Sequence, residues 1–141
     1  NILNDISPES VAIALDPNRI YLNLDNKFPA GHVSRGQKKE LKSEIAQKLL
    51  QLEYNGQKVI RQVFKVEEVY KGKYTALGPD LLVLSYPGFD LKGSIRKKEI
   101  FGRSYLQGMH TWDDAFFWAA EDYGSDLAIQ DIASIIMKKV K

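Results

Sequence analysis

The hydrophobic pattern of this chain changes from a period of two to a period of about 3.6, and this change most constrains its fold. Residues 19–24 alternate between polar and apolar side chains, which is typical of a strand with one buried face. Further along, apolar residues recur on a single face of an expected helix. They are Leu41, Ile45, Leu49 and Leu52. A chain that carries both patterns predicts a mixed α/β (α+β) fold, in which helices flank a mixed sheet.

Turn and capping signals set the limits of these first elements. An apolar run precedes residues 16–18 (Asp-Pro-Asn) and the alternating residues 19–24 follow them, so we expect a β-hairpin. Ser34 and Gln37 have the spacing of a capping box, in which the serine side chain meets an early helix N–H. Residues 55–56 (Asn-Gly) are expected to end the helix. Four lysines are expected to lie largely off its apolar face: Lys38, Lys39, Lys42 and Lys48.

The middle of the chain continues to alternate between strand and helix signals. Residues 58–66 are rich in β-branched side chains and predict a strand, and residues 67–70 suit one helical turn. Residues 81–84 form a continuous apolar run, as expected of a buried strand, and residues 115–120 form another. Between them, residues 87–109 are rich in glycine and charge, and a loop of that length is usually functional or disordered.

The end of the chain predicts a last amphipathic helix. Asp126 or Asp131 can cap it, and basic residues close it, as suits a helix C-terminus. Three apolar side chains are expected to be buried by this helix: Ile132, Ile135 and Ile136.

Length and composition bound the class of protein. The 141 residues suit one domain, and 44% hydrophobic with 27% charged residues is ordinary for a soluble globular chain. A net charge of +2 is too small to indicate nucleic-acid binding. The chain has no run of about 18 apolar residues, so no membrane span is predicted. The absence of cysteine excludes disulfides and thiolate metal sites and favours a cytoplasmic location. Because the chain begins at Asn1 without methionine, we expect a fragment of a longer protein.

Residues 108–117 (Gly-Met-His-Thr-Trp-Asp-Asp-Ala-Phe-Phe) hold the best candidate for chemistry. His110 stands there between a flexible glycine and an acidic turn, an arrangement that can present an imidazole at the rim of a sheet. Neutral imidazole is a common zinc ligand, yet a catalytic zinc needs about three protein ligands, and His32 is expected to be a loop residue. Asp113 and Asp114 could orient His110 through its second ring nitrogen. The alternative is a turn or cap before the apolar run.

Basic residues of the long loop are candidates for binding an anionic substrate. Arg96, Lys97 and Arg103 lie within residues 87–109, where positive charge could steer a phosphodiester toward a site. The alternative is a solvated, charged loop. The chain has neither a Gly-x-Ser-x-Gly elbow nor a phosphate-binding loop that closes with Lys-Ser/Thr, so no catalytic nucleophile is predicted.

Six phrases, read in order, resemble one family. They are Ala-Leu-Asp-Pro-Asn-Arg-Ile-Tyr-Leu-Asn at 14–23, Phe-Pro-Ala-Gly-His-Val at 28–33, Pro-Asp-Leu-Leu-Val at 79–83, Gly-Phe-Asp-Leu-Lys-Gly at 88–93, Gly-Met-His-Thr-Trp-Asp-Asp-Ala-Phe at 108–116 and Gln-Asp-Ile-Ala at 130–133. Together they resemble the C-terminal part of a type I phosphodiesterase/nucleotide pyrophosphatase of the alkaline phosphatase superfamily. The resemblance extends from Val11 to the final helix.

The resemblance implies the C-terminal portion of an alkaline-phosphatase-like fold and a divided active site. Enzymes of this family use two metal ions, usually zinc, which aspartates and histidines hold around a threonine or serine nucleophile. His110 matches the histidine of the family's late Gly-x-His motif and is implied to be a metal ligand. The first metal-binding aspartate, the nucleophile and an Asp-His-Gly motif lie upstream of the matched segment. Thr111 replaces a frequent glycine, which favours a less-characterised phosphodiesterase branch over nucleotide pyrophosphatases proper.

Two classes of function follow. In the first, the chain is the C-terminal portion of a metal-dependent hydrolase of phosphate esters or nucleotides. Isolated from its N-terminal catalytic region, it is expected to be inactive, largely free of metal and prone to self-association through surface that the missing region covers. In the second, it is a non-catalytic binding or interaction module with an anion-binding loop. A nucleic-acid-binding domain would require a concentrated basic face, and we do not expect one.

Overall fold

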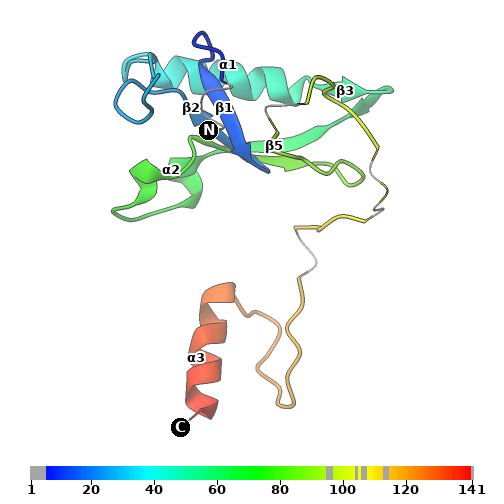
Figure 1. Ribbon diagram of the computed structural model, residues 1–141. Helices are drawn as coiled ribbons and strands as arrows, with labels where there is room; N and C mark the ends of the chain where they lie inside the picture. Colours follow the sequence, from blue (N-terminus) through cyan, green and yellow to red (C-terminus); the bar gives the residue numbers. More distant parts are fainter. Residues whose placement is uncertain (1–5, 95–96, 104, 106–107, 113–114, 141) are drawn as a thin grey trace. The chain divides into compact units, whose positions relative to one another are not determined.

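The computed structural model describes residues 6–94, 97–103, 105, 108–112 and 115–140 of the chain. They belong to two compact units, Asn1–His110 (unit 1) and Thr111–Lys141 (unit 2) (Figure 1). Unit 1 combines an antiparallel sheet with helices, which confirms the predicted mixed α/β class.

The sheet of unit 1 has four strands in the order β1-β2-β6-β5. Their bounds are Ala12–Asp16 for β1, Arg19–Leu22 for β2, Ile60–Lys65 for β5 and Leu81–Ser85 for β6. Every pair of neighbouring strands in this sheet is antiparallel. A tight turn joins β1 to β2, as is usual for an antiparallel hairpin. The parallel pairing of the expected mixed sheet is limited, among described residues, to one bridge between Leu24 and Val33.

The first hairpin is confirmed in its position and its turn. Ile13 pairs with Tyr21, and Asp16 pairs with Arg19 across residues 17–18. Asn18 has a φ of 65°, the left-handed region that asparagine tolerates better than most residues.

The predicted amphipathic helix is α1, Lys38–Leu50. Before it, the Ser34 N–H donates to Oε1 of Gln37 at 3.0 Å, which is one of the two hydrogen bonds of the expected capping box. The other bond is absent, because the serine hydroxyl donates to the same Gln37 oxygen and does not accept from a helix N–H. The prediction that residues 55–56 end the helix is wrong. They form the turn between β3 (Glu53–Tyr54) and β4 (Gln57–Lys58), and their positive φ angles of 50° and 76° suit an Asn-Gly hairpin turn.

Two apolar clusters join α1 to the sheet, across which it lies in Figure 1. Leu41 and Ile45 pack against the first cluster, which consists of buried Leu22, Leu24 and Val33. Leu49 and Leu52 pack against the second, which consists of Val59, Ile60 and Val83. The apolar face predicted from the sequence is therefore the face that builds the core.

The segments around β6 complete unit 1. The expected single helical turn is α2, Val66–Val69, and a 3-10 turn, η2, covers Thr75–Leu77. The described residues of 87–109 contain no helix or strand, as predicted, but Phe89, Leu91 and Phe101 pack against the second cluster and anchor this segment.

Unit 2 contains α3, Ile129–Lys139. Its N-cap residue is Ala128, so neither Asp126 nor Asp131 occupies the predicted N-cap position; Asp131, three residues later, accepts a hydrogen bond from the Ala128 N–H at 2.8 Å. Residues 115–120 form no strand, and most of their side chains are exposed, because the described residues of unit 2 contain no sheet to pack against. Ile136 is 53% exposed, contrary to the prediction, while Ile132 and Ile135 are half-buried. Across the described residues of both units, no helix is long and apolar enough to span a membrane.

Candidate functional site

His110 lies at the end of unit 1, where the long loop returns to the sheet. Its neighbour Met109 accepts a hydrogen bond from the Gly88 N–H at 3.0 Å, and Gly88 follows the last residues of β6. The two ends of the 87–109 segment therefore meet beside the sheet, and His110 comes directly after this contact. The His110 side chain is exposed and has no hydrogen-bond or ion-pair partner within the described part of the chain.

The described residues do not make a complete metal site around this imidazole. Nowhere among them do three or more histidine, cysteine, aspartate or glutamate side chains gather as a metal-binding group. Asp113 and Asp114, the candidates to orient His110, lie outside the described residues. His32, the second histidine, has an exposed side chain and uses its backbone N–H to bond the Asn23 carbonyl at 3.0 Å, as suits a loop residue. One exposed imidazole alone falls short of the roughly three ligands that a catalytic zinc needs.

The candidate phosphate-binding cations are placed only in part. Arg96 lies outside the described residues, and both Lys97 and Arg103 are exposed. Phe101, two residues before Arg103, packs against Tyr54 of the β3–β4 hairpin with a centroid-to-centroid distance of 4.5 Å. This contact anchors the segment that carries Arg103. Among the described residues, no hydrogen bond or ring contact joins Lys97 or Arg103 to His110.

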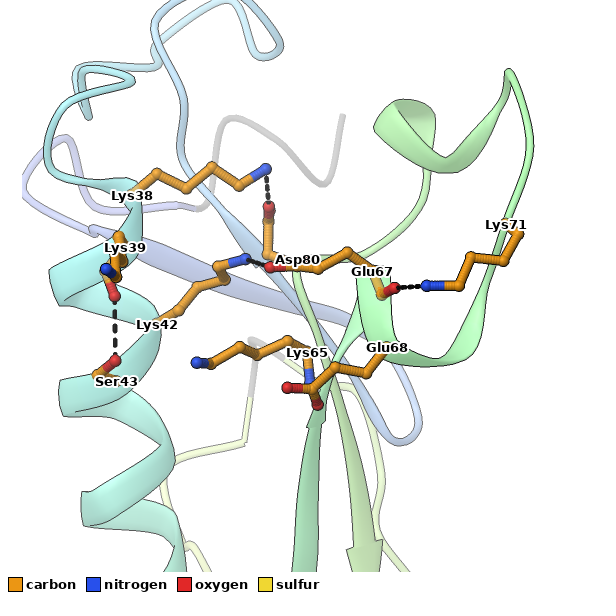
Figure 2. Close-up of polar contacts among 9 residues, drawn as sticks. All are labelled: Lys38, Lys39, Lys42, Ser43, Lys65, Glu67, Glu68, Lys71 and Asp80. Atoms are coloured by element: carbon orange, nitrogen blue, oxygen red, sulfur yellow. Dashed lines mark hydrogen bonds and ion pairs between the residues drawn. The ribbon is translucent and has the colours of Figure 1, made fainter.

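Sequence reasoning missed a cluster of charged residues between α1 and the start of β6, of which Asp80 and Lys42 are buried (Figure 2). Asp80 is 1% exposed, and its carboxylate accepts the Leu22 N–H at 2.8 Å and the Lys38 ammonium at 2.6 Å. Beside this pair, the buried Lys42 ammonium bonds the Glu67 carboxylate of α2. The hydrogen bond from Lys42 holds the pKa of Glu67 below its usual range.

The position of these two lysines corrects the expectation that they lie off the apolar face of α1. Lys38 and Lys42 are four residues apart and lie seven and three residues before Ile45, respectively, so they continue the same helical stripe toward the N-terminus. Lys42 is 5% exposed, because Glu67 neutralises its ammonium group at the edge of the core. The helical spacing of Lys38 and Lys42 from Ile45 was the sequence signal that could have assigned them to the buried face of α1.

A third lysine extends this charged region to the loop before β6. The Lys27 ammonium donates to the Gly78 carbonyl at 2.5 Å and lies 5.2 Å from the ring centroid of Tyr21. Burial lowers the pKa of Lys27, and the nearby Asp80 carboxylate offsets part of that effect. Because both carboxylates of the cluster already bind lysine, the arrangement serves to hold elements together and leaves no carboxylate poised as an acid or base.

Two of the sequence phrases have a clear structural explanation near this cluster. The buried Asn23 side chain donates to the Ser10 carbonyl at 2.9 Å and to the Ala30 carbonyl at 3.3 Å, which shapes the loop that follows β2. A Cβ atom on Gly31 would lie 1.9 Å from the Leu24 carbonyl oxygen, so this position admits glycine alone. These contacts shape the loop that follows β2.

Unit 2 carries a hollow of about 350 Å³ between α3 and residues 117–123. Aliphatic and aromatic side chains line most of it, and the ion pair between Glu121 and Lys139 stands among them. Such a lining suits an apolar group and does not suit a phosphate ester.

No known protein family, no curated protein and no solved structure matches this chain.

Proposed function

We propose that this chain is the C-terminal portion of a metal-dependent phosphodiesterase/nucleotide pyrophosphatase-like hydrolase that acts on phosphate esters. In this proposal His110 supplies one ligand to one of two metal ions, most simply zinc. The remaining ligands and a threonine or serine nucleophile come from an N-terminal catalytic region of the whole protein. The bound metals would activate the nucleophile and stabilise negative charge on the phosphoryl group.

One observation carries the proposal. Among the six phrases that resemble the family, those around Asn23, Gly31 and Asp80 are explained by contacts that shape unit 1. The histidine of the late phrase is different, because no described residue uses the His110 side chain. The His110 imidazole is exposed and makes no bond within the described part of the fold. It is therefore available to bind a metal ion together with residues of the N-terminal region.

The test is to measure metal content and activity in the whole protein. The protein is assayed with bis-p-nitrophenyl phosphate in the presence of Zn²⁺ or Mn²⁺, and bound metal is counted by mass spectrometry. His110→Ala is expected to lower metal content and to reduce kcat/KM by about 100-fold or more, since loss of a ligand weakens both. His32→Ala is the matched control and should change neither, because that side chain is exposed in a loop of the same unit.

The isolated 141-residue chain provides the second arm of this test. It is expected to show no metal-dependent turnover, because it lacks the proposed nucleophile. Robust hydrolysis by the isolated chain that survives His110→Ala would contradict the proposal.

The second candidate is a non-catalytic binding module, and the core of unit 1 favours it. Both apolar clusters of the sheet are closed by residues of unit 1 itself, which is what an independently folding module requires. This candidate predicts that Lys97 and Arg103 bind an anion without metal. Unchanged anion binding in a Lys97→Gln/Arg103→Gln variant would exclude the long loop as the binding site.

A further inference from the structure

The loop between α2 and β6 borders an open hollow. The hollow measures about 260 Å³ and is lined by residues 70–75, 78 and 79. Two tyrosines and two lysines belong to this lining, and no carboxylate does. Its volume is just below the range of about 300–1,000 Å³ that is usual for small-molecule sites, so it suits a small ligand that remains partly exposed.

Both tyrosines of this hollow present ring surface to solvent. Tyr70 is 47% exposed and Tyr74 is 67% exposed, and neither belongs to an apolar cluster of unit 1. The Lys73 ammonium lies 4.9 Å from the ring centroid of Tyr74, so a cation and an aromatic face stand side by side. An aromatic ring of this kind can stack on a nucleotide base, and the adjacent cation can meet the phosphate.

The backbone of the loop adds a row of hydrogen-bond donors. The Tyr70 N–H donates to the Val66 carbonyl, and the Thr75 N–H donates to the Gly72 carbonyl. Between them, the N–H groups of residues 71–74 donate to no group in the described part of the chain. Gly72, in the middle, has a φ of 126°, a conformation that side chains rarely allow. Consecutive unpaired N–H groups in a turn form a concavity that favours anions.

The lining of the hollow contributes two positive charges, Lys71 and Lys73, and no negative charge, while Glu68 of α2 binds the Lys65 N–H. The nearby carboxylates of Glu67 and Asp80 are each bound by a lysine of α1 and are therefore neutralised (Figure 2). The Lys27 ammonium binds the carbonyl of Gly78, a lining residue, and adds a further positive charge at the margin. Lys71 donates to the Glu67 carbonyl and thereby fixes the first turn of the loop.

We propose that this hollow binds a nucleoside monophosphate. The phosphate would meet the N–H groups of residues 71–74 and the Lys73 ammonium, and the base would stack on Tyr74 or Tyr70. This inference goes beyond the proposed hydrolase function, because the hollow uses neither His110 nor a metal.

The experiment titrates AMP into the 141-residue chain in the presence of EDTA and follows backbone amide resonances by NMR. We expect saturable shifts centred on residues 70–75, with a Kd below about 1 mM. Tyr74→Ala should weaken binding about fivefold or more, because it removes a stacking surface, while Tyr74→Phe should stay within about twofold of the original Kd. Lys73→Gln should weaken binding about threefold. Lys48→Gln, an exposed lysine on α1, is the charge-matched control and should leave the Kd unchanged.

The outcomes separate the proposal from its competitors. Inorganic phosphate should compete with AMP, and adenosine should bind more weakly than AMP. Absence of saturation by about 5 mM AMP, or equal weakening by Lys48→Gln and Lys73→Gln, would overturn the proposal. Binding of a single-stranded oligonucleotide without binding of AMP would overturn it too. Because EDTA removes metal from the assay, failure here leaves the proposed hydrolase function untouched, and failure of that function leaves this binding intact.

Discussion

Replacing Asp80 by asparagine tests whether buried charge holds the sheet of unit 1 to α1. The pairing of β2 with β6 ends at Ile20 and Leu81, so the Leu22 N–H lies beyond the ladder and has the Asp80 carboxylate as its partner. The other carboxylate oxygen binds Lys38. Asp80→Asn keeps the size of the side chain, removes its charge and converts one of its two acceptors into a donor.

The expected loss of stability follows from these two bonds. A hydrogen bond to a charged group contributes about 1.5–3 kcal/mol, and breaking a buried ion pair costs about 3–5 kcal/mol. The Lys38 side chain is 33% exposed, so its ammonium can turn toward water and recover part of that cost. We therefore expect Asp80→Asn to lower the free energy of unfolding of unit 1 by about 2–3 kcal/mol. Lys38→Met should cost a similar amount, since it leaves the carboxylate buried with one donor.

A double-mutant cycle isolates the contribution of the pair. Asp80→Asn and Lys38→Met should be non-additive by about 1–2 kcal/mol, because either change removes the same interaction. Urea unfolding is best followed through amide resonances of unit 1, because both tryptophans, Trp112 and Trp118, belong to unit 2.

The control for this cycle is a surface ion pair on the same helix. Lys48 and Glu44 are 2.7 Å apart, and their side chains are 73% and 51% exposed, so Glu44→Gln should cost less than about 0.5 kcal/mol. Additive effects at Asp80 and Lys38, or a loss at Asp80 no larger than at Glu44, would refute the reasoning.

Two further predictions concern the same unit. Gly31→Ala should lower the free energy of unfolding by about 3 kcal/mol or more, because the new Cβ meets the Leu24 carbonyl. Gly56→Ala is the control: residue 56 has open space and a φ of 76°, so the loss should be about 1–2 kcal/mol. Equal losses in urea unfolding would show that the steric clash at residue 31 does not determine the effect. The pKa of Glu67 is lowered in the folded state, so its pairing with Lys42 stabilises fully above the unfolded pKa of about 4.3 and is lost as pH falls through the folded pKa. Glu67→Gln should therefore flatten the acid limb of the stability–pH curve by about 1 kcal/mol, a modest amount because the carboxylate is largely exposed, and an unchanged limb would contradict this assignment.

The regular elements of unit 1 were predictable because local signals determine them. Alternation and a polar turn predicted β1 and β2, and the helical stripe from Leu41 to Leu52 predicted α1 and the face that it buries. Residues 55–56 were misassigned because Asn-Gly serves both as a helix stop and as a hairpin turn, and the distinction depends on the chain that follows. Residues 115–120 were misassigned because an apolar run alone does not show whether a sheet is present to receive it.

The candidate site was less predictable, since it depends on contacts between residues distant in sequence. Asp80 lies 58 positions from Leu22, and no local pattern joins a carboxylate to an N–H group at that separation. Lys42 was assigned to the surface by residue type, although its helical position belongs to the buried stripe, because its burial requires Glu67 at the start of α2. The His110 motif could be singled out from its residues, but its neighbours in space are not encoded in its spacing.

The ion pairs of α1 also hold both ends of the loop that borders the proposed nucleotide hollow. Glu67 precedes the loop and is held by Lys42, while Asp80 follows the loop and is held by Lys38. Both lysines belong to the first turns of α1, so one helix fixes both ends of residues 70–79. Lys27 binds the Gly78 carbonyl as a third attachment. Because the loop packs no aromatic ring into either apolar cluster, these ionic and polar attachments replace core packing as the source of its order. Loss of the Asp80–Lys38 pair should therefore weaken AMP binding together with stability, whereas loss of Tyr74 should weaken binding alone.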